Sequence, residues 1–226
     1  MPLHPGNAKK YDMSTVAPME NSPLAGKTVL FLGSSVTFGS ASLEQGIPEY
    51  FARRFGCHII KEAVSGTTLA DNGTDSYVRR LVDRVPADSP VDLLVCQLST
   101  NDASRGMPLG DLPADPSDTA TVTGAMEFII RYARETWGCP VTFYTGSRFD
   151  SAAYGAMVTR VLELEEKRGI LVLNLWDSKK FNAISPGNRA LYMRDPIHPT
   201  KAGYKCWWCP ELERQLLTLL PRHPIL

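Results

Sequence analysis

The chain has 226 residues, of which 43% are hydrophobic, and its 24 Lys and Arg balance 24 Asp and Glu. This length fits one domain of roughly 100–200 residues, and the balanced charge gives no reason to expect nucleic-acid or anionic-membrane partners. No run of about 18 apolar residues exists, so no membrane-spanning helix is expected. Residues 1–20 lack the apolar core of a secretory signal, which makes the cytoplasm the default location.

The first part of the chain predicts an arm followed by two strand–helix pairs. Residues 1–26 hold several Pro, Gly and Asn and show no periodicity, which favours a flexible N-terminal arm ahead of a domain at 27–226. A short apolar run that ends at Gly33 predicts a buried parallel strand. The expected elements are strands at 27–32 and 57–64 and helices at 42–55 and 75–85.

The rest of the chain repeats this alternation and adds one long loop. Residues 103–119 are rich in Pro, Gly and Asp and are too many for an ordinary connection, so a functional or disordered loop is expected. The last helix, at 201–220, is expected to break or kink near Pro210. The other expected elements are strands at 91–98, 140–145 and 170–175 and helices at 121–137 and 151–168.

The alternation of short apolar strands with helices indicates the fold class. Strands that are apolar on both faces lie inside parallel sheets that helices cover. The prediction is an α/β protein, a three-layer α/β/α sandwich with a central, mostly parallel five-stranded sheet. Such sheets bind ligands beyond the carboxyl ends of their strands, so residues that follow strands are the first site candidates.

Gly33-Ser34-Ser35 directly follows the first expected strand. A serine in this turn can act as a nucleophile if a base takes its proton, and its own N–H can point at an oxyanion. The two serines could instead cap the next helix. The Gly-x-Ser-x-Gly elbow of α/β-hydrolases is not met, because Thr37 occupies the place of its second glycine. No Gly-rich nucleotide-binding pattern follows either.

Asp195-Pro196-Ile197-His198-Pro199 supplies a carboxylate and an imidazole in a segment that prolines keep out of a helix. With this spacing, Asp195 can accept from one ring nitrogen of His198 while the other ring nitrogen faces a serine. The ordinary alternative is a turn that caps the helix after it.

Two further motifs also follow strands. Gly66 offers a backbone N–H with no side chain in the way, and Asn101 offers a neutral amide donor; both suit an oxyanion hole. A turn glycine and an Asx-turn are the alternatives. Asp102 is expected to fix its loop or cap a helix rather than to be catalytic.

The five cysteines are scattered, which does not suggest a disulfide framework. Cys206 and Cys209 form a C-x-x-C pair, but they lie in the last helical region and no further ligands with zinc spacing stand out. We expect them to be ordinary helix or core residues, and we expect no metal site.

These blocks together resemble the SGNH hydrolases, the superfamily that includes the GDSL lipases and esterases, over the chain from about residue 27 to its end. The resemblance implies a flavodoxin-like sandwich with Ser35 as nucleophile, Asp195 and His198 as the acid–base pair, and Ser35, Gly66 and Asn101 as oxyanion donors. Two residues depart from the family pattern. Ser34 replaces an Asp that would tie down the nucleophile turn, and Thr100 replaces a frequent Gly.

The resemblance implies a serine esterase that needs no metal or organic cofactor. Its expected substrate is a small-molecule or carbohydrate ester with a short acyl group, including O-acetyl groups on sugars. A lipase or thioesterase acting on longer acyl chains is an alternative. The Ser34 substitution also leaves room for a catalytically silent, ligand-binding member of the fold. The oligomeric state cannot be predicted from these residues.

Overall fold

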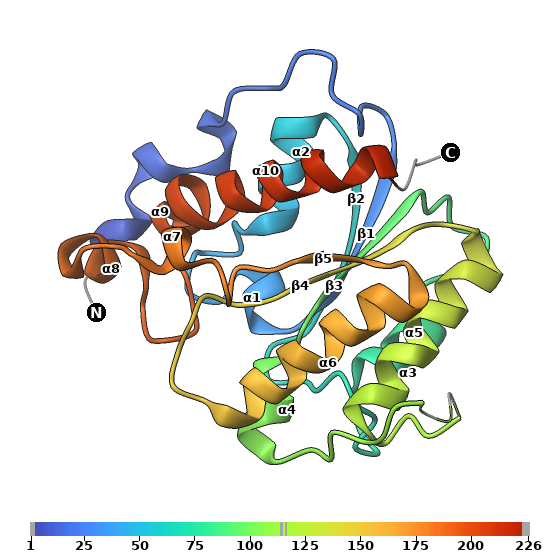
Figure 1. Ribbon diagram of the computed structural model, residues 1–226. Coiled ribbons are helices and arrows are strands. Elements are labelled where there is room, and N and C mark those ends of the chain that lie inside the picture. The colour runs from blue at the N-terminus through green and yellow to red at the C-terminus, as the bar shows by residue number, and fades with distance from the viewer. Residues whose placement is uncertain (1–2, 114, 116, 223–226) are drawn as a thin grey trace.

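Five parallel strands form the centre of the molecule. The computed structural model describes residues 3–113, 115 and 117–222 (Figure 1). The strands lie in the order β2-β1-β3-β4-β5, and each neighbouring pair is parallel. The predicted five-stranded sheet is confirmed, and it is parallel throughout. The strands are β1 (Thr28–Gly33), β2 (His58–Ala63), β3 (Leu93–Gln97), β4 (Val141–Tyr144) and β5 (Leu171–Leu173).

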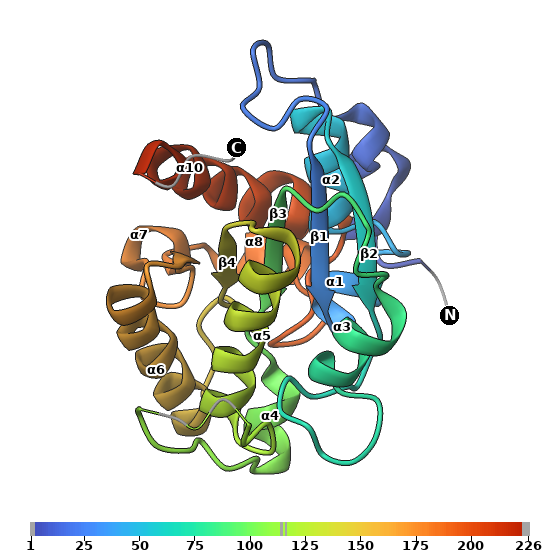
Figure 2. The same cartoon turned by 90° about the vertical axis from the view of Figure 1, so that its right-hand side faces the viewer.

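Helices cover both faces of this sheet, which confirms the three-layer sandwich (Figures 1 and 2). On β1, Leu30 and Leu32 join one hydrophobic core, whereas Val29 and Phe31 join the other. This follows from the strand geometry, in which successive side chains point to opposite faces. One layer holds α3 (Tyr77–Arg84), α5 (Val122–Trp137) and α6 (Ala152–Arg168), and the other holds α2 (Ile47–Phe55) and α10 (Cys209–Leu219).

The segment before β1 packs onto the domain, contrary to the flexible arm that its composition predicted. It forms three short 3-10 turns, at Pro5–Asn7, Lys9–Tyr11 and Met13–Thr15. Met13, Val16 and Leu24 are buried in the core beside α2 and α10. The anchoring residues are single and widely spaced, so the sequence shows no period that would reveal them.

Four short helices were not expected from the sequence. Each has four to seven residues, too few to repeat a helical period. The side chains of Ser99, Ser178 and Ser185 cap three of them by accepting backbone N–H groups. The expected loop at 103–119 therefore begins later, because its first residues complete a helix. These helices are α1 (Ser35–Phe38), α4 (Thr100–Arg105), α7 (Lys179–Asn182) and α8 (Pro186–Tyr192).

The last helical region runs through Pro210 without the predicted break, but its regular α-helical turn is interrupted just before that proline. It begins as α9 (Lys201–Gly203), widens into a π-helical stretch at Tyr204–Trp208 and continues as α10. Proline removes one N–H and crowds the preceding turn, which accounts for the wide turn just before it. Cys209 is fully buried and Cys206 is exposed, and all five cysteines are free thiols.

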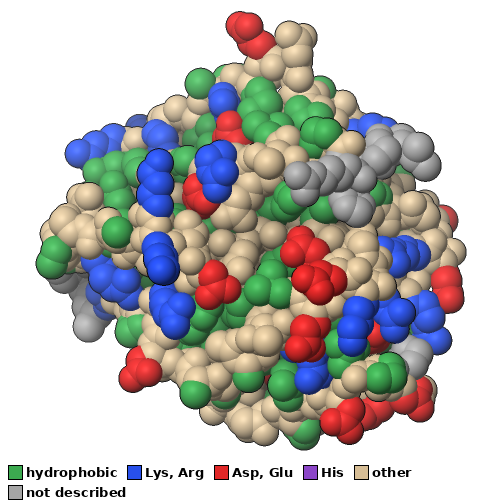
Figure 3. Space-filling model, viewed as in Figure 1, with side chains coloured by type: hydrophobic (Ala, Val, Ile, Leu, Met, Phe, Trp, Pro, Cys, Tyr) green, Lys and Arg blue, Asp and Glu red, His purple; other side chains and the backbone are tan. Residues whose placement is uncertain are grey.

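The surface carries charges of both signs. On the face shown in Figure 3, basic and acidic side chains are intermixed, in keeping with the balanced composition. Within the described residues, no helix is both long and apolar enough to cross a bilayer. The same residues contain no group of three or more His, Cys, Asp or Glu placed to hold a metal ion.

Candidate active site

Ser35 lies where β1 ends and α1 begins, at the carboxyl edge of the sheet. Ser34 is the N-cap residue, so Ser35 is the first residue of the helix and its N–H has no intrahelical acceptor. The Ser35 Oγ is 2.8 Å from Nε2 of His198, although the two residues are 163 positions apart in the sequence. The fold therefore brings a residue from the first part of the chain into contact with a residue from its last part.

Asp195 and His198 form a compact loop between α8 and α9. His198 Nδ1 lies 2.8 Å and 3.0 Å from the two carboxylate oxygens of Asp195. The same carboxylate accepts the backbone N–H groups of Ile197 and His198, each at 2.8 Å. The Arg194 N–H donates to the His198 carbonyl at 2.9 Å and closes the loop. A continuous chain of hydrogen bonds thus runs from Asp195 through His198 to Ser35.

The charge of Asp195 determines which atoms donate and which accept along this series of hydrogen bonds. Partial burial acts to raise the pKa of Asp195, but the two backbone N–H groups and the imidazole outweigh it and hold the pKa below its usual value. Asp195 is therefore ionised at neutral pH and can only accept hydrogen bonds. We accordingly assign the imidazole proton to Nδ1, which leaves Nε2 free to accept from the Ser35 hydroxyl.

Gly66 and Asn101 lie close together at the same edge of the sheet as Ser35. The Asn101 amide donates to the Thr67 carbonyl at 2.8 Å, and Arg105 Nη2 donates to the Gly66 carbonyl at 2.7 Å. These bonds hold the Gly66 peptide against α4. Gly66 has a φ of +83°, a conformation that glycine adopts without strain.

Three donors remain at this edge for a ligand. Among the residues that the structure describes, the N–H groups of Ser35 and Gly66 have no hydrogen-bond acceptor. A primary amide has two N–H donors, and Asn101 uses one of them on Thr67. The three predicted oxyanion donors are therefore all available where β1, β2 and β3 end.

Asp102 has the structural function that the sequence predicted. It is fully buried, and its carboxylate accepts the N–H groups of Leu69 at 2.7 Å and Ala70 at 2.9 Å. Burial raises the pKa of Asp102, and the hydrogen bonds from Ser99, Ala70 and Leu69 oppose that rise. The residue fixes the loop that follows Gly66 and does not contact Ser35 or His198.

Gln97 was missed by the sequence analysis, although it holds the nucleophile turn. Its side-chain oxygen accepts the Ser34 N–H at 3.0 Å, the Thr37 N–H at 3.1 Å and the Thr37 hydroxyl at 2.8 Å. Its side-chain nitrogen donates to the Ser34 hydroxyl at 3.2 Å. A neutral amide thus ties down the turn that an Asp at position 34 would have anchored. A glutamine in an otherwise apolar strand was the sequence signal for it.

Arg80 is the second residue that sequence reasoning missed. Its side chain is 1% exposed and reaches from α3 to the end of β1. Its Nη2 donates to the Gly33 carbonyl at 2.8 Å and to the Thr67 hydroxyl at 3.0 Å, and its Nη1 pairs with the Glu62 carboxylate at 2.8 Å. Arg80 therefore links the turn that carries Ser35 to the turn that carries Gly66.

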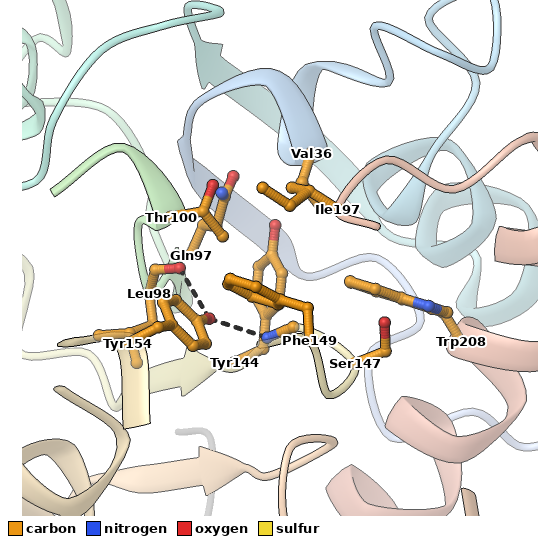
Figure 4. A pocket seen from close by; sticks show the side chains of 11 residues that line it. Val36, Gln97, Leu98, Thr100, Tyr144, Ser147, Phe149, Tyr154, Ile197 and Trp208 are labelled. Atoms are coloured by element: carbon orange, nitrogen blue, oxygen red, sulfur yellow. Dashed lines mark hydrogen bonds between the residues drawn. The ribbon is translucent and has the colours of Figure 1, made fainter. Parts of the chain in front are cut away.

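A narrow pocket with a volume of about 10 Å³, which is room for about one water molecule, lies beside the Ser35 side of the site (Figure 4). Three of its lining residues, Val36, Thr100 and Ile197, are chain neighbours of Ser35, Asn101 and His198. Aromatic rings form much of the remaining wall. The lining residues are Val36, Gln97, Leu98, Thr100, Tyr144, Gly146, Ser147, Phe149, Tyr154, Ile197 and Trp208.

Comparisons with known proteins identify the family of this chain. Residues 31–206 match the model of the GDSL-like lipase/acylhydrolase family. No curated protein sequence matches the chain.

Several solved structures share the fold at low sequence identity. A protein from Lactobacillus plantarum is 22% identical, with a TM-score of 0.71 over 88% of this chain and 98% of that one. A G-D-S-L family protein from Desulfitobacterium hafniense is 17% identical, with a TM-score of 0.65 over 86% and 100%. An acetyl xylan esterase from Geobacillus stearothermophilus is 18% identical, with a TM-score of 0.59 over 87% and 95%. At these identities the likeness shows the fold alone.

Proposed function

The chain belongs to the GDSL-like lipase/acylhydrolase family, and we propose that it is a serine esterase that forms an acyl-enzyme on Ser35. The observation that carries the proposal is the chain of hydrogen bonds from Asp195 through His198 to Ser35. This pattern of nucleophile, base and orienting carboxylate recurs on unrelated folds and is recognised by its geometry.

In the first half of the reaction, the Ser35 oxygen bonds to the ester carbonyl carbon while its proton passes to Nε2 of His198. The carbonyl oxygen becomes an oxyanion, which the N–H groups of Ser35 and Gly66 and the amide of Asn101 stabilise. His198 then gives its proton to the leaving oxygen as the bond to the alcohol breaks. An acyl group remains on Ser35.

In the second half, water takes the place of the alcohol. His198 accepts a proton from the water as its oxygen attacks the acyl carbon, and it returns that proton to Ser35 when the acyl bond breaks. Asp195 stays ionised and stabilises the imidazolium in both halves. The carboxylic acid then leaves, and Ser35 regains its hydroxyl.

The pocket supports a short acyl group as the substrate. It is small, and Phe149, Tyr154 and Trp208 close it, so an acetyl group fits more readily than a long chain. O-Acetyl groups on carbohydrate are the substrate class that we favour, and an acetyl xylan esterase shares the fold. The bonds from Gln97 to Ser34 and Thr37 support an active enzyme over a silent ligand-binding protein, because they hold the nucleophile turn without the usual Asp.

Hydrolysis of p-nitrophenyl acetate, butyrate and octanoate tests this proposal. We expect kcat/KM to be highest for acetate, because each methylene that the pocket cannot hold costs about 10- to 200-fold. Rates that rise with chain length would point instead to a lipase or thioesterase. A folded protein that hydrolyses none of these esters, nor an acetylated sugar, would contradict the proposed activity.

A further inference from the structure

Ser147 is an unexpected residue in the wall of this pocket. It is 2% exposed, and its hydroxyl has no hydrogen-bond partner among the described residues. A buried hydroxyl without a partner costs free energy, whereas an alanine at the same place would not. Such a group within a ligand pocket indicates that a ligand satisfies it.

The backbone on both sides holds Ser147 in place. The Gly146 N–H donates to the Tyr154 hydroxyl at 2.9 Å, and the Arg148 N–H donates to the side-chain oxygen of Asn182 at 2.8 Å. Figure 4 shows the Ser147 hydroxyl directed toward the ring of Trp208, another residue that lines the pocket. The hydroxyl therefore has a fixed position inside the pocket before any ligand arrives.

Several other polar groups of the pocket are already occupied. The Tyr154 hydroxyl donates to the Leu98 carbonyl at 3.1 Å while it accepts from Gly146. The Tyr144 hydroxyl pairs with Thr37 at 2.6 Å, and the Gln97 amide is used by the nucleophile turn. The Trp208 indole nitrogen is also buried without a partner, but Figure 4 shows the carbon edge of that ring directed toward Phe149.

The pocket that Ser147 lines also borders the reacting pair. Val36 and Ile197 line the pocket together with Ser147, and each is bonded along the chain to a residue of the reacting pair, Ser35 or His198. The carbonyl carbon of an acyl-enzyme is attached to the Ser35 oxygen, so the rest of the acyl group extends past these two residues into the pocket.

We propose that, among acyl groups larger than acetyl, the pocket selects short hydroxyacyl groups, and that Ser147 is the residue that recognises the hydroxyl of the acyl group. The inference rests on the proposed esterase function and narrows its substrate class. A serine hydroxyl both donates and accepts, so it pairs with an acyl hydroxyl in either direction. An acyl group that ends in a methyl group of the same size leaves Ser147 without a partner. This difference favours the acyl group that ends in a hydroxyl.

Glycolyl and propionyl esters test the proposal, because the two acyl groups have equal numbers of heavy atoms and differ only in a terminal hydroxyl or methyl. The measured quantity is the ratio of kcat/KM for p-nitrophenyl glycolate to that for the propionate, divided by the same ratio for alkaline hydrolysis. This division removes the intrinsic reactivity of the two esters. In the wild-type protein we expect the corrected ratio to exceed one by roughly tenfold.

The variant Ser147→Ala is expected to bring the corrected ratio down to about one, because the hydroxyl that distinguishes the two esters is gone. If the corrected ratio of the wild-type protein exceeds one and the Ser147→Ala variant has the same ratio, the assignment to Ser147 is wrong. A wild-type ratio of one or less would overturn the proposal even if the variant does not fold. Turnover of the acetate ester by the wild-type protein tests the esterase function separately, so the two failures are distinguishable.

Discussion

Replacing Ser35 by alanine is expected to lower kcat for p-nitrophenyl acetate by about 10⁶-fold, which is the scale of losing a serine nucleophile. The hydroxyl contacts Nε2 of His198 at 2.8 Å, and no other side chain within the described residues makes that contact. Alanine removes one oxygen from a buried helix start and leaves the turn's bonds to Gln97 intact. Initial rates at saturating ester, with far-UV circular dichroism and thermal melting as checks of folding, give the result.

Ser34→Ala is the matched control, because the sequence alone leaves open which serine attacks. The Ser34 side chain is fully buried, and its hydroxyl accepts from Gln97 instead of facing His198. We expect a loss far smaller than that of Ser35→Ala, through the weakened anchor of the turn. Equal losses in the two variants would mean that the turn itself, rather than the Ser35 hydroxyl, limits the reaction.

Replacing Asn101 by alanine is expected to lower kcat by about 10²–10³-fold with a smaller change in KM, because an oxyanion donor acts mainly in the transition state. The amide uses one N–H on the Thr67 carbonyl and has the second available for the oxyanion. Steady-state kinetics on the acetate ester separate kcat from KM.

Arg105→Ala separates the oxyanion contribution from the support of the loop. Arg105 donates to the Gly66 carbonyl at 2.7 Å, so its loss loosens the same turn without removing an oxyanion donor. We expect this variant to lose much less activity than Asn101→Ala. If both variants lose the same amount of activity, Asn101 acts only by holding the turn, and its assignment to the oxyanion hole is wrong.

The sequence predicted the sheet, and which candidate residues come to its edge, because both depend on local patterns that follow chain order. Four of the strands are short, mostly apolar runs with buried residues on both faces, as a parallel sheet between helices requires, whereas β2 at the edge of the sheet is only partly buried. Ser35, Gly66 and Asn101 each follow a strand, and parallel strands end at one edge. Asp195 and His198 were paired from their spacing alone, and their hydrogen bonds form within one loop.

Other features depend on contacts between distant parts of the chain, and the sequence carries little sign of them. Gln97 is 63 residues from Ser34, and Arg80 is 47 residues from Gly33, yet their side chains hold the nucleophile turn. The N-terminal segment is ordered by contacts such as the Asn7 side chain with the Lys201 N–H, 194 positions away. Such pairs have no periodicity, so pattern analysis cannot find them.

Covalent labelling by a fluorophosphonate probe tests the central claim most directly. The Ser35 oxygen bonds to phosphorus, and fluoride leaves as the hydroxyl proton passes to His198. Intact mass spectrometry and peptide mapping of the labelled wild-type protein should show one adduct, on the peptide that contains Ser35, and none in Ser35→Ala. A folded protein that hydrolyses esters but carries no adduct, or carries it on another residue, would contradict the account.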